Sequence, residues 1–283
     1  MKRKVNIIVV IVLFLAGLSL LLYPLAANQW NSYRQRKLIA NYQQNMESQK
    51  EETGFEAEWA KARAYNDQLM PMILPDSFAI AEASGRDEAY MACLNRNGDA
   101  IMGIVEIPKI HVELPIYHTT EEKTLEIGAG HLEGSSLPVG GENTHTVISA
   151  HRGLPSATLF TDLDKMEKGD HFLLHILDDT LCYEVDQINV VEPEETELLG
   201  VEEGKDLATL LTCTPYGVNT HRLLVRGHRV PYDPSEVREE GNKRFSVSLH
   251  TNYLLWAGIG LGITGGVIFI LYLRDKRKNN QKK

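Results

Sequence analysis

Short apolar runs separated by turn residues dominate the chain from Ile101 to Val230, and no long helical period interrupts them. Runs of this kind, bounded by Gly, Pro, Asn and Asp, are typical of β-strands. The runs that we interpret as strands are Ile101–Ile107, Val112–Tyr117, Thr146–Ala150, Phe172–Leu177, Leu181–Val191, Leu207–Leu211 and Leu223–Val230. Strands that follow one another without helices between them favour a closed or nearly closed barrel over an α/β sheet.

The segment before these strands has a different pattern. Residues 30–70 carry apolar positions at helical spacing, and Thr53-Gly54 divides them into two predicted helices. Residues 70–100 mix prolines, glycines and acids, including Leu74-Pro75-Asp76-Ser77-Phe78, without a sustained period. This stretch is therefore predicted to be a long loop with one short helix, and a loop of that length usually has a function.

Both ends of the chain carry long uncharged apolar runs. The run at residues 5–27 follows Lys2, Arg3 and Lys4, and the run at 254–273 precedes a basic tail. Each is long enough to cross a bilayer, and the positive-inside rule places both basic ends in the cytoplasm. We therefore expect the middle of the chain to lie outside the membrane. A cleavable signal peptide ending near Ala26-Ala27 is the alternative for the first run, although its length favours a retained span.

Composition narrows the classes of function. The 283 residues carry a net charge of −9, and an acidic pI near 5.6 argues against nucleic-acid binding. Three cysteines are too few for a disulfide scaffold, and at least one of them stays unpaired. The predicted organisation is a cytoplasmic tip and span at 1–27, an extracytoplasmic helical extension and loop at 28–100, the barrel at 101–235, a linker at 236–253, a span at 254–273 and a basic cytoplasmic tail at 274–283.

Cys213 is the first candidate for chemistry, because it lies where the apolar run 207–211 passes into the turn Thr214-Pro215-Tyr216-Gly217. Such a position exposes a side chain at the rim of a barrel, although a buried structural thiol is the alternative. A nucleophilic thiol needs a base or a cation beside it. The final run brings Arg222 back to the level of Cys213, where a guanidinium can stabilise an oxyanion; a surface arginine paired with an acid is the alternative.

Ten histidines are candidates for the base, and their spacing alone does not select one. His151 leaves a predicted strand for a loop, as Cys213 does. No histidines or cysteines have metal-ligand spacing, so we expect no metal site and no cofactor.

These residues together resemble a known family, the class C or pilin-polymerising sortases. The resemblance rests on three segments: Thr209-Leu210-Leu211-Thr212-Cys213 with Arg222 nine positions on, Ser149-Ala150-His151-Arg152-Gly153, and Gly103-Ile104-Val105-Glu106-Ile107-Pro108. It covers residues 101–232. The fold that it implies is mainly β: an eight-stranded β-barrel with an N-terminal helical extension and lid, between flanking transmembrane helices.

The resemblance also implies the chemistry. Cys213 is the expected nucleophile, His151 the general acid and base, and Arg222 the oxyanion stabiliser. The expected substrate is a pilin with an LPxTG-like sorting signal, cleaved between Thr and Gly and joined to a lysine amine of another pilin at the cell membrane. Class C sortases carry an Asp-Pro-aromatic lid, whose counterpart here is Asp76-Ser77-Phe78, without the proline.

Three other functions remain open from the sequence. A housekeeping sortase would join proteins to a cell-wall precursor amine instead of polymerising them. A non-catalytic membrane scaffold would bind a partner through its acidic barrel. A hydrolytic cysteine protease would release a free acid. The products formed with a pilin, and the effect of Cys213→Ala on them, discriminate among these functions.

Overall fold

The computed structural model describes residues 2–69, 74–78, 87–242, 258–260 and 262–266. It divides into two compact units, one comprising residues 1–27 and 246–283 and the other residues 28–245. The described residues contain no helix with the length and apolarity of a membrane span. Most of the predicted span at 254–273 lies outside the described residues.

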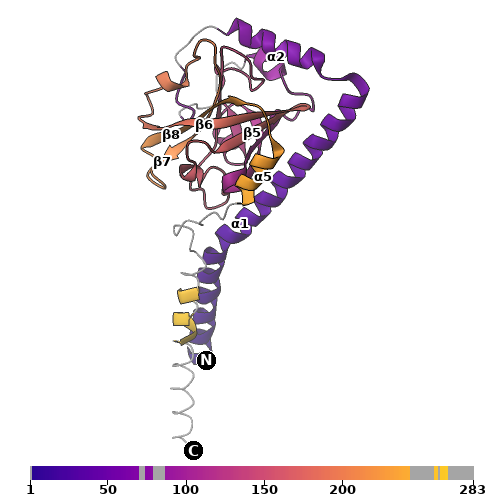
Figure 1. The fold of residues 1–283 in the computed structure, drawn as a ribbon. Coiled ribbons are helices and arrows are strands. Elements are labelled where there is room, and N and C mark those ends of the chain that lie inside the picture. Colours follow the sequence, from indigo (N-terminus) through magenta and orange to yellow (C-terminus); the bar gives the residue numbers. More distant parts are fainter. Residues whose placement is uncertain (1, 70–73, 79–86, 243–257, 261, 267–283) are drawn as a thin grey trace, which may run out of the picture. The chain divides into compact units, whose positions relative to one another are not determined.

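Eight strands of the second unit close into a barrel, as expected (Figure 1). Their order around the barrel is β1-β2-β3-β4-β7-β8-β6-β5. The pairings β2–β3 and β4–β7 are parallel and the others are antiparallel. The strands are β1 (Ile101–Ile107), β2 (Val112–His118), β3 (Ala129–His131), β4 (Thr144–Ser149), β5 (His171–Ile176), β6 (Asp179–Val191), β7 (Asp206–Thr214) and β8 (His221–Val230).

Helices precede, connect and follow the strands. The predicted break at Thr53-Gly54 separates the first two helices, and the short helix expected in residues 70–100 is α3. The α-helices are α1 (Lys2–Thr53), α2 (Glu56–Gln68), α3 (Glu88–Ala92), α4 (Glu122–Leu125) and α5 (Pro234–Asn242), and the 3₁₀ helices are η1 (Pro108–Ile110), η2 (Leu163–Lys165) and η3 (Glu197–Leu199).

The extension packs on the barrel through buried side chains and specific hydrogen bonds. Ile39, Tyr42 and Met46 of α1 are buried at helical spacing. The Tyr42 hydroxyl donates to the Met102 carbonyl at 3.1 Å and accepts from the Leu177 amide at 3.2 Å. A polar side chain at the centre of this contact fixes the position of the helix on the barrel, because it leaves no buried group unpaired.

Tyr90 of α3 ties the segment before β1 to the barrel in a similar way. Its hydroxyl lies 3.0 Å from Nδ1 of the buried His131, and His118 Nε2 lies 2.8 Å from the Cys93 carbonyl. Burial lowers the pKa of His131 to about 4, so this imidazole is neutral at physiological pH. The segment that carries α3 is therefore fixed on the barrel without a buried charge.

The sheet formed by β4, β7 and β8 is covered on both faces. Alternate residues point to opposite faces of a strand. Ile148, Leu210 and Val225 belong to the main core of the barrel. Their neighbours on the other face form a second cluster, which Leu74 and Phe78 of the 74–78 segment complete: Leu74, Leu132, Val147, Leu199, Leu211 and Leu224, with Phe78 and Val191 packed against them. The segment 74–78 thus covers the outer face of the sheet.

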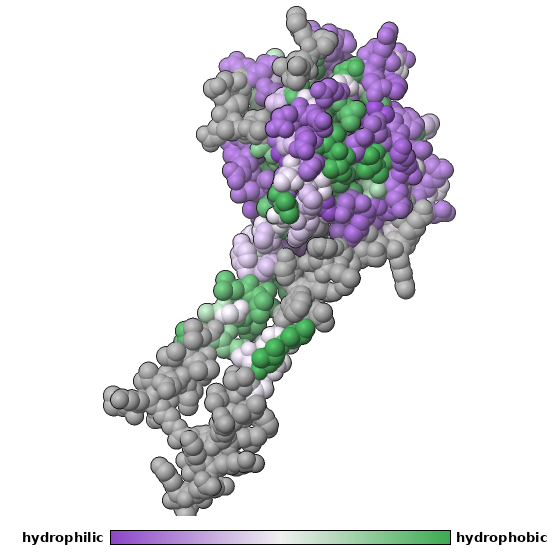
Figure 2. Space-filling view, turned by 90° about the vertical axis from the view of Figure 1, so that its left-hand side faces the viewer, coloured by the Kyte–Doolittle hydropathy of each residue, from purple (hydrophilic) through white to green (hydrophobic). Residues whose placement is uncertain are grey.

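The surface of the barrel unit is mostly hydrophilic around a smaller apolar patch on the face seen in Figure 2. This pattern agrees with the excess of acidic over basic residues in the chain.

Candidate active site

Cys213 and Arg222 lie directly opposite each other on adjacent strands. Cys213 is the penultimate residue of β7, Arg222 is the second residue of β8, and the antiparallel register pairs them. Both side chains are largely buried, with a relative exposure of 6% for Cys213 and 11% for the Arg222 side chain. The structure therefore places the two residues at one level of the sheet, as their spacing predicts.

His151 reaches the same level from β4. The parallel pairing of β4 with β7 ends at Ser149 opposite Leu211, so His151 and Cys213 each lie two residues beyond the last pair. Parallel neighbours end at the same edge of a sheet, and for that reason their following residues meet. His151 is half-buried. No hydrogen bond joins it to Cys213 among the described residues, as is common in unliganded catalytic sites.

The 74–78 segment lies over these residues and contacts two of them. Asp76 makes a bidentate ion pair with Arg222, with Oδ1 2.7 Å from Nε and Oδ2 2.7 Å from NH2. The ring of Phe78 lies 5.4 Å from the His151 ring and 5.2 Å from the guanidinium carbon of Arg222. The structure thus brings all five predicted site residues together, and the Phe78 ring contacts both the imidazole and the guanidinium.

Comparisons with known proteins agree with this geometry. A family model described as "Sortase domain" matches residues 105–230. The structure of Sortase C from Streptococcus pneumoniae is 51% identical to the chain, with a TM-score of 0.65, over 69% of this chain and 98% of that one. The chain belongs to the class C sortases.

Two further relatives give the extent of the similarity. Sortase C-1 from Actinomyces oris is 48% identical over 62% of this chain and 97% of that chain, with a TM-score of 0.60. Sortase D from Bacillus subtilis (strain 168) is 35% identical over 131 residues, which are 45% of this chain. The chain spans 63% of the length of that relative. The match to the family model lies within the barrel.

Burial and the lid set the protonation of the sortase site. Burial raises the pKa of the Cys213 thiol, and the Asp76 carboxylate raises it further, whereas Arg222 lowers it. Burial lowers the pKa of His151, against the opposite effect of Glu122 and Glu126. With the segment 74–78 in place, a neutral thiol and a neutral imidazole are therefore the forms expected near pH 7.

The other two cysteines lie elsewhere in the fold, Cys93 at the end of α3 and Cys182 in β6. Cys93, Cys182 and Cys213 are all buried thiols, not disulfides. The described residues contain no group of His, Cys, Asp and Glu arranged to hold a metal ion. The groups that the structure gathers at the sortase site are the Cys213 thiol, the His151 imidazole and the Arg222 guanidinium.

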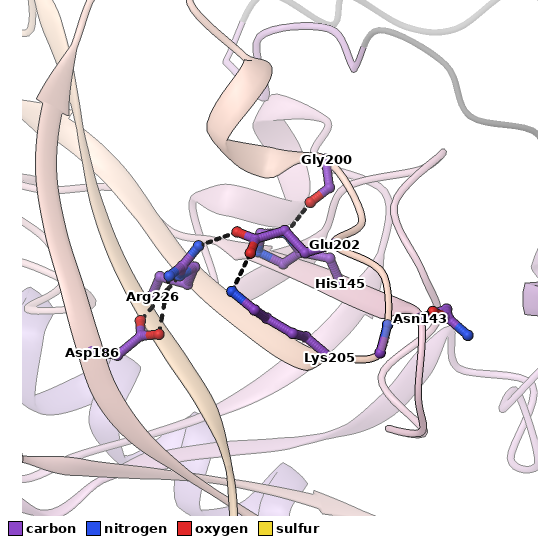
Figure 3. A network of polar contacts seen from close by, with 8 residues as sticks. Asn143, His145, Asp186, Gly200, Glu202, Lys205 and Arg226 are labelled. Carbon is purple, nitrogen blue, oxygen red and sulfur yellow. Dashed lines mark hydrogen bonds and ion pairs between the residues drawn. The ribbon is translucent and has the colours of Figure 1, made fainter.

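A second arginine of β8 lies on the same face of the sheet as Arg222. Arg226 donates from Nε and NH2 to both carboxylate oxygens of Asp186 at 3.0 Å, and from NH1 to Glu202 at 2.5 Å (Figure 3). In the same network the His145 ring lies 2.7 Å from the Gly200 carbonyl. This network fixes the end of the β6–β7 connection on the sheet.

Proposed function

We propose that the protein is a membrane-anchored cysteine transpeptidase that polymerises pilins. The observation that carries this proposal is the meeting of Cys213, His151 and Arg222 at one end of the β4–β7–β8 sheet. Sortases are cysteine transpeptidases, and the Streptococcus pneumoniae Sortase C structure was described for its insights into catalysis and pilin substrate specificity. The expected substrate is accordingly a pilin with an LPxTG-like signal.

In the first half-reaction Cys213 attacks the threonine carbonyl of the signal. The thiol proton passes to His151 as the sulfur–carbon bond forms, and Arg222 donates hydrogen bonds to the oxyanion. His151 then gives the proton to the leaving glycine amine as the Thr–Gly bond breaks. A thioester on Cys213 is the result, and no step consumes a nucleotide.

In the second half-reaction a lysine amine of another pilin attacks the thioester. The amine proton passes through His151 to the departing sulfur, which restores the thiol. The product is an isopeptide bond between two pilins. Because the amide cleaved and the amide formed have similar energies, the exchange needs no external energy source.

Residues 74–78 act in this proposal as a lid that substrate must displace. Asp76 occupies the guanidinium that is needed for the oxyanion, and the Phe78 ring contacts both that guanidinium and His151. The ion pair and the packing of Leu74 in the second apolar cluster hold the segment without the proline typical of the family motif. The lid thereby shields the thiol from water and oxidants.

The membrane location completes the proposal. The spans proposed at 5–27 and 254–273 hold the barrel on the extracytoplasmic side, with both termini in the cytoplasm. That side is where a pilin carrying a sorting signal is exposed after its export. A cysteine-accessibility scan with a membrane-impermeant reagent tests this topology: a label on residue 2 or 280 in intact cells would contradict it.

A polymerisation assay tests the function. The full chain in detergent is incubated with a pilin that carries both a sorting signal and lysines, and the products are separated by denaturing electrophoresis. Ladders of covalent oligomers that disappear with Cys213→Ala are expected. Single adducts with a cell-wall amine would indicate a housekeeping sortase, and free acid alone a protease. Ladders that persist with Cys213→Ala would contradict the catalytic assignment.

A further inference from the structure

The backbone ladder that aligns β4 with β7 ends before it reaches the reacting residues. The last paired residues are Ser149 and Leu211, and the last backbone hydrogen bond runs from the Ala150 amide to the Leu211 carbonyl at 3.2 Å. His151 and Cys213 both lie past this point. Their relative position therefore depends on what joins the two chain segments beyond the ladder.

Two side-chain hydrogen bonds make this connection, one on each side of the reacting residues. The Thr212 hydroxyl donates to the Ala150 carbonyl at 2.8 Å. Arg152 NH1 donates to the Thr214 hydroxyl at 3.1 Å. The residues immediately before Cys213 and His151 are thus joined to each other, and so are the residues immediately after them.

Arg152 also holds the loop that follows His151. Its Nε donates to the Thr161 carbonyl at 3.1 Å, and its NH2 pairs with Asp164 at 2.5 Å. The His151 carbonyl in turn accepts a hydrogen bond from the Phe160 amide at 3.1 Å. One guanidinium therefore links β7 to both ends of the 151–164 loop.

The Arg152 guanidinium is buried, so its role is not that of an ordinary surface arginine. The Arg152 side chain is only 8% exposed, and a buried cation is costly unless hydrogen bonds and an opposite charge compensate for it. Only arginine can donate to a carbonyl, a hydroxyl and a carboxylate at once from one planar group. A lysine ammonium is a single point charge. The contacts on all three sides indicate that the geometry, rather than the charge alone, is what the residue supplies.

We propose that Arg152 is a positioning residue, which holds the His151 imidazole at the correct distance from the Cys213 sulfur by bridging the His151 loop to the Thr214 hydroxyl. Among the described residues the Arg152 guanidinium hydrogen-bonds to Thr161, Thr214 and Asp164 rather than to the imidazole or the thiol, so it acts through the chain segments on either side of them. This proposal rests on the proposed function, since it assigns a role within the same proton transfer.

Thr214→Val is the sharpest variant, because it removes the acceptor and keeps the β-branched shape, while Thr214→Ser is the matched control that keeps the hydroxyl. Both are made in the full chain with Asp76→Ala, so that lid opening does not limit the rate. Thioester formation with a synthetic sorting peptide is followed by mass spectrometry at several peptide concentrations. In Thr214→Val we expect kcat to fall about tenfold and KM to change less than about twofold, since misplacement of a catalytic group affects the chemical step.

Two further comparisons distinguish a positioning role of Arg152 from a general loss of structure in the variants. Thr214→Ser is expected to keep kcat within about twofold of its parent. Arg152→Lys combined with Thr214→Val is expected to lose no more activity than the worse single variant, because both break the same bridge. The proposal would be overturned if kcat were unchanged in Thr214→Val or if only KM changed. It would also be overturned if the activity loss of the double variant equalled the product of the losses in the two single variants.

A measurement without substrate keeps the test independent of the proposed function. Hydrogen exchange of the peptide covering residues 150–164 is expected to accelerate in Thr214→Val and to remain unchanged in Thr214→Ser, with the rest of the barrel unaffected. If the parent forms no thioester, the proposed function fails, but the exchange comparison still shows whether the hydrogen bond from Arg152 to Thr214 holds the loop. Equal exchange in Thr214→Val and its parent would overturn the bridge even in an active enzyme.

Discussion

Arg222 and Arg226 lie on the same face of β8, and each binds both oxygens of an aspartate, yet their partners differ in a decisive way. The partner of Arg226 is Asp186 on the adjacent strand β6, whose neighbour Gln187 is paired with Arg226. The partner of Arg222 is Asp76, 146 residues away in sequence and on the segment that covers the sheet. The same pair is thus made within the barrel at one level of the sheet and to a covering segment at the other, and our proposal makes only the second pair releasable.

Under the proposed function, what separates the two arginines is whether the segment that carries the partner aspartate moves, rather than the ion pair itself. Arg226 cannot lose Asp186 without opening the barrel, and Glu202 adds a second carboxylate from the β6–β7 connection. In the proposed mechanism Arg222 loses Asp76 when the segment 74–78 moves away. The guanidinium then faces Cys213 with donors free for a substrate oxygen.

The largest effect is expected when Arg222 is replaced by lysine. Arg222→Lys keeps the charge and loses the fork, and we expect kcat/KM for thioester formation to fall about a hundredfold. Steady-state assays in the Asp76→Ala background measure this loss apart from lid release. Arg226→Lys is the matched control, and its turnover should stay near that of its parent. Equal losses in the two variants would remove the distinction between the two arginines.

The next largest effect is on stability, and here we expect Arg226 to matter more than Arg222. Arg226→Met leaves Asp186 without its cation and Glu202 with Lys205 alone, and we expect the free energy of unfolding to fall by about 2 kcal/mol, a value reduced for the partial exposure of the carboxylates. Arg222→Met should cost less, because Asp76 can move into water with the lid. Urea denaturation of both variants provides the comparison, and a greater loss in Arg222→Met would reverse our assignment of fixed and releasable pairs.

Opening the lid should make the thiol more reactive. In the double variant Asp76→Ala with Phe78→Ala, we expect alkylation of Cys213 by iodoacetamide to accelerate about tenfold, the factor expected if the lid covers the thiol about nine-tenths of the time. The loss of the carboxylate acts in the same direction, since Asp76 raises the pKa of the thiol. Asp186→Ala is the control and should leave the rate unchanged. An unchanged rate in the double variant would contradict the proposal that residues 74–78 cover the thiol.

The smallest effect is a pH dependence of stability that arises at His145, in the network around Arg226. Burial lowers the pKa of His145, with a smaller contribution from Arg226, against the opposite effect of the Gly200 carbonyl and of the Glu202 and Asp186 carboxylates. The unfolded chain therefore binds this proton more readily, and stability is lost as the pH falls below about 6.5 towards the folded-state pKa. His145→Gln should reduce this loss of stability, measured by thermal unfolding at pH 7 and pH 5, and the exposed His228→Gln should not. Equal acid sensitivity in both variants would contradict this role for His145.

Much of the barrel can be predicted from the sequence, because its longer strands are apolar runs between turn residues. The strand β3 was not predicted, since its three residues Ala129–His131 include a glycine and follow another. Only pairing with β2 and β4 defines it as a strand. A strand that is stabilised mainly by its neighbours carries little local signal.

The site could be predicted in part for a similar reason. The antiparallel turn between β7 and β8 is local, so the spacing of Cys213 and Arg222 already indicates their proximity. The parallel pairing of β4 with β7 joins distant segments, and for that reason His151 could be selected among ten histidines only by resemblance. The bridge from Arg152 to Thr214 depends on the same pairing and has no sequence signal of its own.

The most direct measurement is the mass of the chain after reaction with a synthetic LPxTG peptide in the Asp76→Ala background, followed by proteolysis to locate the adduct. We predict a thioester on Cys213 that carries the peptide up to its threonine, is released by hydroxylamine, and is absent from Cys213→Ala. An adduct on Cys93 or Cys182, or equal peptide cleavage by Cys213→Ala, would contradict a site built from Cys213, His151 and Arg222.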